Sequence, residues 1–440
     1  MAERAFDTAK FEESGAIFSR PVFKDDVAYF GGEDTYFYAV DTKTGQKRWE
    51  MKTDGIIFSR PVLHEDILYF GSFDHYIYAV SIKTKCLLWK LKLNGIVASS
   101  PVLFKDLLFV GSSDTYLYAI SIKNKAIVWK FKTGDEIICD PVVLDGKIFF
   151  GSMDGYFYCV DVSGKLLWKF RTGDSIILGT PLVTKKFVCF GSADNNLYCM
   201  APDGDLLWAV RTGDMVFNNA SVYDNVVYFG SRDRHIYALD AKTGNVLWKS
   251  RTDIQIAASA PLKISNRIYI GADKLYCFSC NGQRIRVSEL CDAIPSGPDY
   301  YKGNVFAGCD DGYFRCFSAE DGRLMWRFHT NSNKIISLVG VARPPLWNPD
   351  FFKEHDIMLG RPQALQPKEP YGVSENLLYG MGLGSVDVGS LPENKKYAEP
   401  SVGGVYKDMQ GGGVAYIPGE KGKKKDKELD VFLHNLGLQG

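Results

Sequence analysis

Hydrophobic and polar residues alternate along this chain in short runs, and the whole pattern recurs with a period of about 40 residues. One repeat holds four apolar runs, DPVV, KIFFG, YFYCV and LLWKF, within residues 140–170. In YFYCVD the side chains of Tyr156, Tyr158 and Val160 fall on one face, because successive residues of a strand point to opposite faces. Gly, Ser and Asp turns separate the runs. Each repeat therefore predicts four short antiparallel strands.

A tryptophan marks the same place in nearly every repeat. The first six follow one another at a nearly constant interval of one repeat, and the seventh comes after close to two repeats. Between the last two, Arg286 occupies the matching place of the seventh unit. Four short strands repeated eight times predict an all-β fold, an eight-bladed β-propeller of four-stranded blades over residues 1–340. The repeat tryptophans are Trp49, Trp89, Trp129, Trp168, Trp208, Trp248 and Trp326.

The two ends of the repeat region predict how the ring closes. The text NSNKIISLVGVARPP after the eighth unit resembles the start of a further unit. Near the N-terminus, AKFEESGAIFSRP resembles a fourth strand followed by a first. We therefore expect the two ends to lie together in one closing blade, so that removal of residues 1–15 would lower the melting temperature.

The residues before each tryptophan resemble the tryptophan-docking motif of pyrroloquinoline-quinone (PQQ) repeat propellers. The motif is clearest in two units, which read Ala-x-Asp-x-x-x-Gly-x-x-x-Trp, and two other units replace its Asp and Gly by Ser and Lys. In that family the indole packs against the neighbouring blade and the Asp fixes the turn that presents it. The resemblance implies this structural role for the seven tryptophans and for Asp41, Gly45, Asp240 and Gly244.

The family resembled contains quinone-dependent dehydrogenases and also a non-enzymatic lipoprotein that helps to assemble outer-membrane barrels. The enzymes of the methanol-dehydrogenase kind use two adjacent cysteines, a calcium ion and a catalytic Asp. This chain has no Cys-Cys pair, and its blade-start positions offer Arg20, Arg60, Asp140 and Asn219 but no dense carboxylate cluster. We expect no catalysis, no cofactor and no metal site. A quinone-dependent enzyme and a small-ligand sensor that uses the central channel are the alternatives.

Other residues of catalytic type have simpler structural explanations. No pair of the six histidines has metal-ligand spacing, and Cys277 of the Cys277-x-x-Cys280 pair stands where other repeats have Ala. Seven acidic residues in register could attract a cation, but each is also placed to cap its own turn. These are Asp34, Asp74, Asp114, Asp154, Asp194, Asp233 and Asp311.

Charge and terminal sequence bear on partners and location. The net charge is zero and the pI about 7, so no basic excess points to nucleic acid. Charged residues at Glu3, Arg4 and Asp7 interrupt any apolar run of a signal peptide, and no apolar stretch is long enough to span a bilayer. We expect a cytoplasmic protein that binds neither nucleic acid nor membrane.

The pattern changes near Arg343. Residues 341–420 are rich in Pro and Gly but also carry aromatic side chains, which solvated linkers avoid. This composition predicts an extended arm with little regular structure. We expect it to dock onto a protein partner through residues such as Trp347, Phe351 and Phe352. Packing back onto the propeller and simple disorder are the alternatives.

Residues 421–440 combine a basic spacer with a short amphipathic helix. Leu429, Phe432, Leu433 and Leu436 follow the i, i+3, i+4, i+7 pattern of a helix that lies in a groove. The sequence thus predicts a non-catalytic scaffold within a larger assembly. The outer edge of blades seven and eight, near residues 280–299, is expected to contact the arm or a partner, because unit seven lacks its tryptophan.

Overall fold

The computed structural model describes residues 15–217, 219–288 and 293–330. The predicted arm over 341–420 and the predicted helix over 421–440 lie outside the described residues. So do the partner-contacting side chains named above, which are Trp347, Phe351, Phe352, Leu429, Phe432, Leu433 and Leu436.

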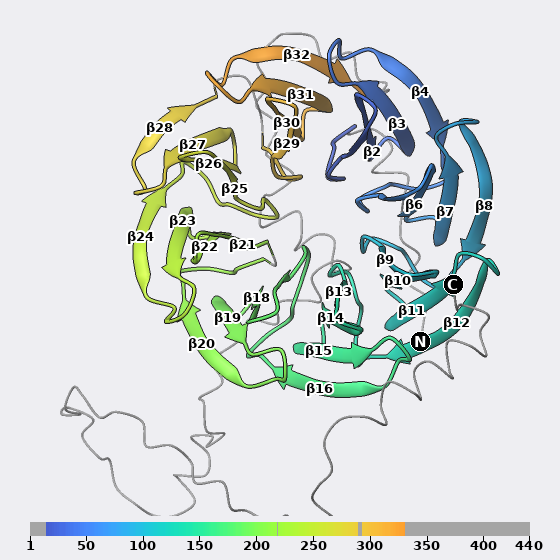
Figure 1. Ribbon diagram of the computed structural model, residues 1–440, viewed down its shortest axis with the longest axis horizontal. Helices are drawn as coiled ribbons and strands as arrows, with labels where there is room; N and C mark the ends of the chain where they lie inside the picture. The colour runs from blue at the N-terminus through green and yellow to red at the C-terminus, as the bar shows by residue number, and fades with distance from the viewer. Residues whose placement is uncertain (1–14, 218, 289–292, 331–440) are drawn as a thin grey trace, which may run out of the picture. The chain divides into compact units, whose positions relative to one another are not determined.

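The described residues form eight four-stranded antiparallel sheets arranged around a common axis (Figure 1). This confirms the eight-bladed β-propeller. Blades one to four comprise β1 (Val22–Lys24), β2 (Val27–Gly31), β3 (Tyr36–Asp41), β4 (Lys47–Lys52); β5 (Val62–His64), β6 (Ile67–Gly71), β7 (Tyr76–Ser81), β8 (Cys86–Lys92); β9 (Val102–Phe104), β10 (Leu107–Gly111), β11 (Tyr116–Ser121), β12 (Ala126–Lys132); and β13 (Val142–Leu144), β14 (Lys147–Gly151), β15 (Tyr156–Asp161), β16 (Leu166–Arg171).

Blades five to eight repeat the same order, with the first strand innermost and the fourth outermost (Figure 1). They comprise β17 (Leu182–Val183), β18 (Val188–Gly191), β19 (Asn196–Met200), β20 (Leu206–Arg211); β21 (Ser221–Tyr223), β22 (Val226–Ser231), β23 (His235–Asp240), β24 (Val246–Arg251); β25 (Leu262–Ile264), β26 (Arg267–Gly271), β27 (Leu275–Ser279), β28 (Arg284–Val287); and β29 (Asp299–Tyr301), β30 (Asn304–Gly308), β31 (Tyr313–Ser318), β32 (Leu324–His329).

The second and third strands of each blade make up the core. In β15 both faces are buried, because each side of the sheet packs against a neighbouring blade. Phe157 of blade four stacks on Phe190 of blade five with ring centroids 3.9 Å apart. Within the described part of the chain there is no helix long and apolar enough to cross a membrane.

Each fourth strand contains a β-bulge, which directs the tryptophan toward the next blade in every blade except the seventh, where Arg286 takes its place. In blade six Ala238 pairs with Trp248 but Leu239 pairs with Val246, so Leu247 is the extra residue. A bulge of this kind bends the strand and re-aims the following side chain. It also leaves the residue before the tryptophan facing outward, and Leu247 is 54% exposed.

Trp208 shows what the re-aimed indole does. Its Nε1 donates a hydrogen bond of 3.1 Å to the carbonyl of Ala241 in the next blade. Its ring lies over Gly244, where a Cβ atom would come within 2.8 Å of the indole. Gly244 has a φ of +72°, so the turn itself also favours glycine there. Asp240 accepts a 2.8 Å bond from the Thr243 N–H and fixes this turn.

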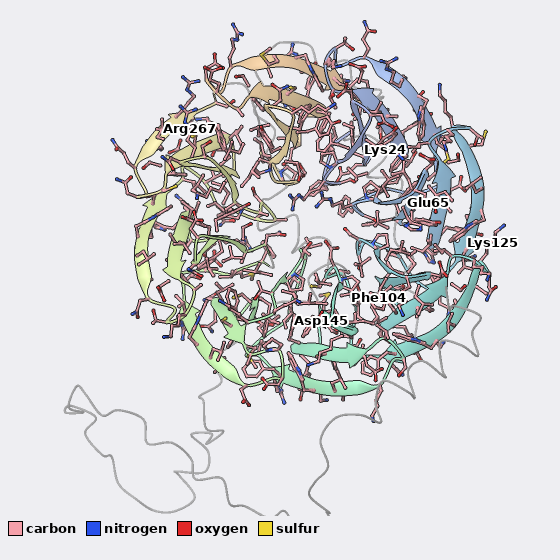
Figure 2. All side chains as sticks on the ribbon, in the orientation of Figure 1. Lys24, Glu65, Phe104, Lys125, Asp145 and Arg267 are labelled. Atoms are coloured by element: carbon pink, nitrogen blue, oxygen red, sulfur yellow. The ribbon has the colours of Figure 1, made fainter. Side chains whose placement is uncertain are left out.

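The same docking contact recurs around the ring, and the tryptophan of the last blade docks on the first. Lys85 and Lys125 hold the left-handed conformation where other units have glycine, with φ of 59° and 56°. Lys125 lies at the outer edge of blade three (Figure 2). The further indole–carbonyl pairs are Trp129–Val162, Trp168–Pro202, Trp248–Cys280 and Trp326–Thr42, each over a turn glycine (Gly164, Gly204, Gly282 and Gly45).

The described ends of the repeat region meet at blade eight. Within the described ranges, each of the eight sheets holds four consecutive strands, and blades one and eight share no strand. The stretches that predicted a shared closing blade, residues 9–14 and 331–345, lie outside the described residues. Ile17 N–H donates to Cys309 O at 3.1 Å, and Thr330 Oγ1 donates to Gly15 O at 2.8 Å. Gly308 allows this close approach, since a Cβ there would lie 2.5 Å from the Ile17 side chain. Residues 15–17 thus pack on blade eight as every later connector packs on its preceding blade.

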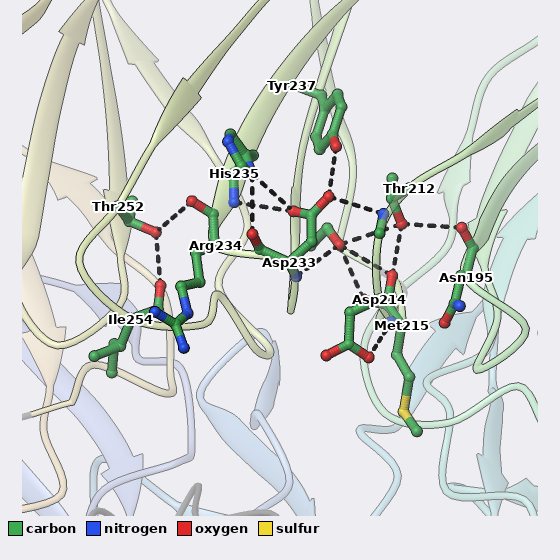
Figure 3. A network of polar contacts seen from close by, with 12 residues as sticks. Asn195, Thr212, Asp214, Met215, Asp233, Arg234, His235, Tyr237, Thr252 and Ile254 are labelled. Atoms are coloured by element: carbon green, nitrogen blue, oxygen red, sulfur yellow. Dashed lines mark hydrogen bonds and ion pairs between the residues drawn. The ribbon is translucent and has the colours of Figure 1, made fainter.

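The aspartates in register serve as turn latches, as Figure 3 shows for Asp233. One carboxylate oxygen accepts the His235 N–H at 3.0 Å, and the other accepts the Tyr237 hydroxyl at 2.5 Å and the Gly213 N–H at 3.0 Å. Burial raises the pKa of Asp233, but these hydrogen bonds outweigh it and hold the pKa below its ordinary value. The latch therefore ties the second turn of a blade to the connector that enters the blade.

We predict that Trp208→Ala lowers the free energy of unfolding by about 3–5 kcal/mol, because it removes a buried ring and leaves a cavity between blades. Urea unfolding followed by circular dichroism measures this. Leu207→Ala is the matched control, since Leu207 is 50% exposed, and should change stability by less than about 0.5 kcal/mol. Equal effects of the two substitutions would contradict the docking role.

Candidate functional site at the channel mouth

Each of the first six blades places one polar blade-start residue at the central channel, whereas blades seven and eight have Ala260 and Gly297 at this position. The polar residue precedes a proline in the first five blades, and the constant repeat places it next to that of the following blade. Arg60 N–H donates to Ser100 Oγ at 2.9 Å, and Ser100 N–H donates to Asp140 Oδ1 at 2.6 Å. This polar ring continues through Thr180, whose N–H donates to Asn219 Oδ1 at 3.3 Å.

A salt bridge joins the last blade to the first in this ring. Arg20 Nε and Nη2 donate to the two oxygens of Asp299 at 3.0 and 2.7 Å, the paired geometry that suits a guanidinium. Arg60 Nη2 lies 3.7 Å from the same carboxylate. Burial lowers the pKa of Arg20, but the Asp299 charge and hydrogen bonds prevail and raise it. Arg20 is therefore a fixed cation whose charge is already matched.

Asp140 is a half-buried acid at the same cavity. Thr180 Oγ1 donates to its Oδ2 at 2.7 Å, in addition to the bond from Ser100. Burial raises the pKa of Asp140, although these hydrogen bonds act in the opposite direction. Both carboxylate oxygens thus serve to hold neighbouring blades together.

The ring surrounds a cavity of about 70 Å³ with an apolar floor. Phe18 and Phe58 stack there with ring centroids 4.6 Å apart, and Phe58 packs edge-on against Phe73 at 4.8 Å. Ile138 and Leu178 line the same cavity. Small-molecule pockets usually enclose about 300–1,000 Å³, so this cavity has room only for a small polar group or a few waters.

The structure brings together the four blade-start residues that sequence spacing singles out. Arg20, Arg60, Asp140 and Asn219 all line this one cavity. Sequence analysis missed Asp299, which completes the ring. Its only signal is the text SGPD, where blade eight has an acid just after the proline found at every blade start except that of blade six.

The channel residues do not fit a calcium-bound quinone. The cavity is small for a three-ring cofactor, and the Arg20 and Asp140 side chains are engaged by Asp299, Ser100 and Thr180. Within the described ranges, no three His, Cys, Asp or Glu side chains are grouped to hold a metal ion. The ring is built to join blades rather than to hold this cofactor.

Two family models match the chain in succession. Residues 8–225 match the β-propeller of the beta-alanine-activating enzyme, and residues 232–347 match the outer membrane protein assembly factor BamB. The chain belongs to the PQQ-like repeat β-propellers. This confirms the family resemblance that the tryptophan-docking motif indicated. The indole contacts between neighbouring blades have the geometry of that motif.

Solved structures show the same fold at low sequence identity. BamB from Moraxella catarrhalis has a TM-score of 0.59 and 18% identity, and the match covers 67% of this chain and 94% of BamB. The computationally designed protein Ika8 has a TM-score of 0.62 and 18% identity, with 69% and 96% covered. At this identity the likeness concerns the fold alone.

Two curated enzymes are similar over short segments. Lupanine 17-hydroxylase [cytochrome c] of Pseudomonas sp. is 30% identical over 139 residues, which cover 26% of this chain and 20% of the enzyme. The dehydrogenase subunit of the quinone alcohol dehydrogenase of Gluconobacter oxydans is 28% identical over 133 residues, covering 29% and 14%. The chain thus matches only about a fifth or less of either enzyme's length.

Glu136 is a second carboxyl group whose pKa is raised. It takes the place that Ile56 and Ile96 hold in the two preceding connectors, next to the apolar cluster that holds Phe73 and Met153. Burial, with a smaller contribution from Asp135, raises the pKa of Glu136 to about 8. The folded protein therefore keeps this carboxyl protonated at a pH where the unfolded chain would release the proton.

We predict that Asp299→Asn lowers the free energy of unfolding by about 2–4 kcal/mol, because it leaves the Arg20 guanidinium without its carboxylate. The cost stays below that of a fully buried pair because Arg20 is 24% exposed. Thermal and urea unfolding measure it. Asp224→Asn removes the acid of the surface pair with Lys263 and is the control, which should melt close to the wild type. A wild-type-like Asp299→Asn would contradict the role of the ring.

We predict that Glu136→Gln flattens the fall of stability with rising pH. Because the folded pKa of about 8 lies above the ordinary value of 4.5, this group's contribution is present below pH 4.5 and is lost as pH rises toward 8. Unfolding free energies at pH 5 and pH 8.5 should differ more in the wild type than in the variant. Parallel pH profiles would show that Glu136 titrates normally.

Proposed function

We propose that this protein is a non-catalytic scaffold that binds protein partners, as a subunit of a larger assembly. The propeller would contribute its loop faces and outer surface, and the chain beyond residue 340 would serve as a docking arm. The observation that carries the proposal is a basic and apolar belt formed by the eight fourth strands, which are the outermost strands of the blades.

The belt is apolar because of the bulges. The two residues before the tryptophan both face outward, and Leu206 and Leu207 are each 50% exposed. Blade two repeats this with Leu87 and Leu88. Adjacent exposed apolar side chains of this kind give the outer surface an apolar area that a partner could cover. The belt residues exposed by more than 40% are Leu87, Leu88, Ile127, Leu166, Leu206, Leu207, Val246, Leu247, Ile285 and Met325.

The belt is basic although the chain as a whole is neutral. Each fourth strand carries at least one Lys or Arg, and within these eight strands as described the only acidic residue is Glu50. A protein segment with acidic and apolar side chains would match both properties. The lysines and the bulges also discourage edge-to-edge pairing of the outer strands with other copies.

The chain after residue 340 enters the proposal through its sequence. The residues that would contact the partner are Phe351 and Phe352 on the arm, and Leu429, Phe432, Leu433 and Leu436 on the terminal helix. Relatedness to the BamB model supports an assembly role, because that family description names an assembly factor. We place the scaffold in the cytoplasm, which agrees with buried cysteines that take the place of alanine, such as Cys159 and Cys199.

The second candidate is a quinone-dependent dehydrogenase, favoured by the short segment shared with the quinone alcohol dehydrogenase subunit. It predicts that PQQ added with calcium raises the melting temperature, because a ligand that binds only the folded state must stabilise it. The channel geometry favours the scaffold over this candidate.

We predict that the full chain holds a protein partner in near-stoichiometric amount and that residues 1–340 lose it. Quantitative affinity purification from native extract compares the two. A full-length variant with Leu429, Phe432, Leu433 and Leu436 changed to Ser should retain the fold and weaken capture, because it removes the apolar face. Leu87→Ser with Leu88→Ser tests the belt in the same assay. Absence of any partner on all forms would contradict the proposal.

A further inference from the structure

The seam between blades seven and eight lacks the indole found at the other described seams. Arg286 pairs with Cys277 in register, as Trp248 pairs with Ala238 one blade earlier. Its side chain lies over Gly322, where a Cβ atom would come within 3.0 Å of Cδ and Nη1 of Arg286. The guanidinium therefore covers the turn glycine in place of an aromatic ring.

The polar part of the docking contact is taken over by other residues. Ala319 directly follows β31, as Ala241 follows β23, so its carbonyl is the counterpart of the one that accepts from Trp208. Here the Tyr269 hydroxyl donates to Ala319 O at 2.9 Å, and Arg267 Nη1 donates at 3.3 Å. Arg267 is seen at blade seven in Figure 2. Nothing polar remains for an indole N–H to satisfy at this carbonyl.

No described residue replaces the apolar part of the contact. A cavity of about 300 Å³ lies beside Arg286 and is walled by Val287, Phe317 and Leu324. It is roomier than the channel mouth, with its 70 Å³. A space of this size takes one large side chain, and a guanidinium on its wall favours the face of an aromatic ring.

We propose that Trp347 of this chain fills this seam as the eighth docking tryptophan. The chain has eight tryptophans, and seven stand at repeat positions. Trp347 follows shortly after Thr330, the last described residue of blade eight. The chain between the two reaches up to about 55–60 Å when extended, more than twice the length of a blade strand, so it can return to the seam.

The seam thus supplies a cavity and a cation, and the chain supplies one spare indole within reach. This inference goes beyond the proposed scaffold function and does not depend on it. It assigns Trp347 to the chain's own propeller and leaves Phe351 and Phe352 as partner contacts. A docked Trp347 would fix the point at which the arm leaves the ring.

The first test is a double-mutant cycle on the full chain, read as melting temperature. Trp347→Ala should lower it by about 3 °C or more, as expected for loss of a packed ring. Arg286→Trp restores the repeat tryptophan at the seam, so in that background Trp347→Ala should have no effect. Phe351→Ala is the matched control and should melt like the wild type. An unchanged melt of Trp347→Ala, or an equal loss in both backgrounds, overturns the proposal.

A second measurement does not depend on stability. In protein labelled with 5-fluorotryptophan, the ¹⁹F signal that disappears in Trp347→Phe belongs to Trp347. We expect it away from the position of a solvent-exposed indole and expect Arg286→Ala to move it, while Lys263→Ala on the same blade leaves it in place. A signal at the exposed position, or one insensitive to Arg286, shows that Trp347 does not fill the seam and overturns the proposal. Partner capture is measured in a separate assay. A failure of the scaffold proposal can therefore be told apart from a failure of the Trp347 proposal.

Discussion

The indole that lies over a turn glycine of the next blade is the contact on which the rest of the ring depends. It couples three features that would otherwise be unrelated. The bulge in the fourth strand aims the ring, the left-handed glycine makes room for it, and the aspartate turn presents a carbonyl to its N–H. Because a four-stranded blade cannot bury both of its faces alone, these seams convert eight weak sheets into one fold.

The same contact explains why the outer surface is suited to binding. The bulge that points Trp248 inward turns Leu247 outward, so the requirement for docking creates exposed apolar residues at regular intervals. Inside the ring the situation is reversed. Arg20, Asp299 and Asp140 bind neighbouring blades, and apolar rings close the channel beneath them. The surface that remains available for partners is therefore the outside of the propeller and its loops.

Local repetition made most of this architecture predictable. The constant repeat period placed every blade, and it placed Arg20, Arg60, Asp140 and Asn219 at one site because equal spacing puts equivalent residues side by side. Ring closure was not predictable in the same way. Residues 15–17 act as an ordinary connector onto blade eight, and the repeat-like text that suggested a shared blade lies outside the described residues. Asp299 was missed for a related reason, since its partner Arg20 lies at the opposite end of the repeat region and is adjacent only once the ring is closed.

The central functional claim is that the protein works inside a larger assembly. The most direct measurement is the mass of the native particle in gently prepared extract, by size separation followed by detection of this chain. The account predicts a particle well above the 49.2 kDa of the chain, reduced to a lower mass when residues 341–440 are removed. A particle of about the chain's own mass in both cases would contradict the account and return attention to the channel.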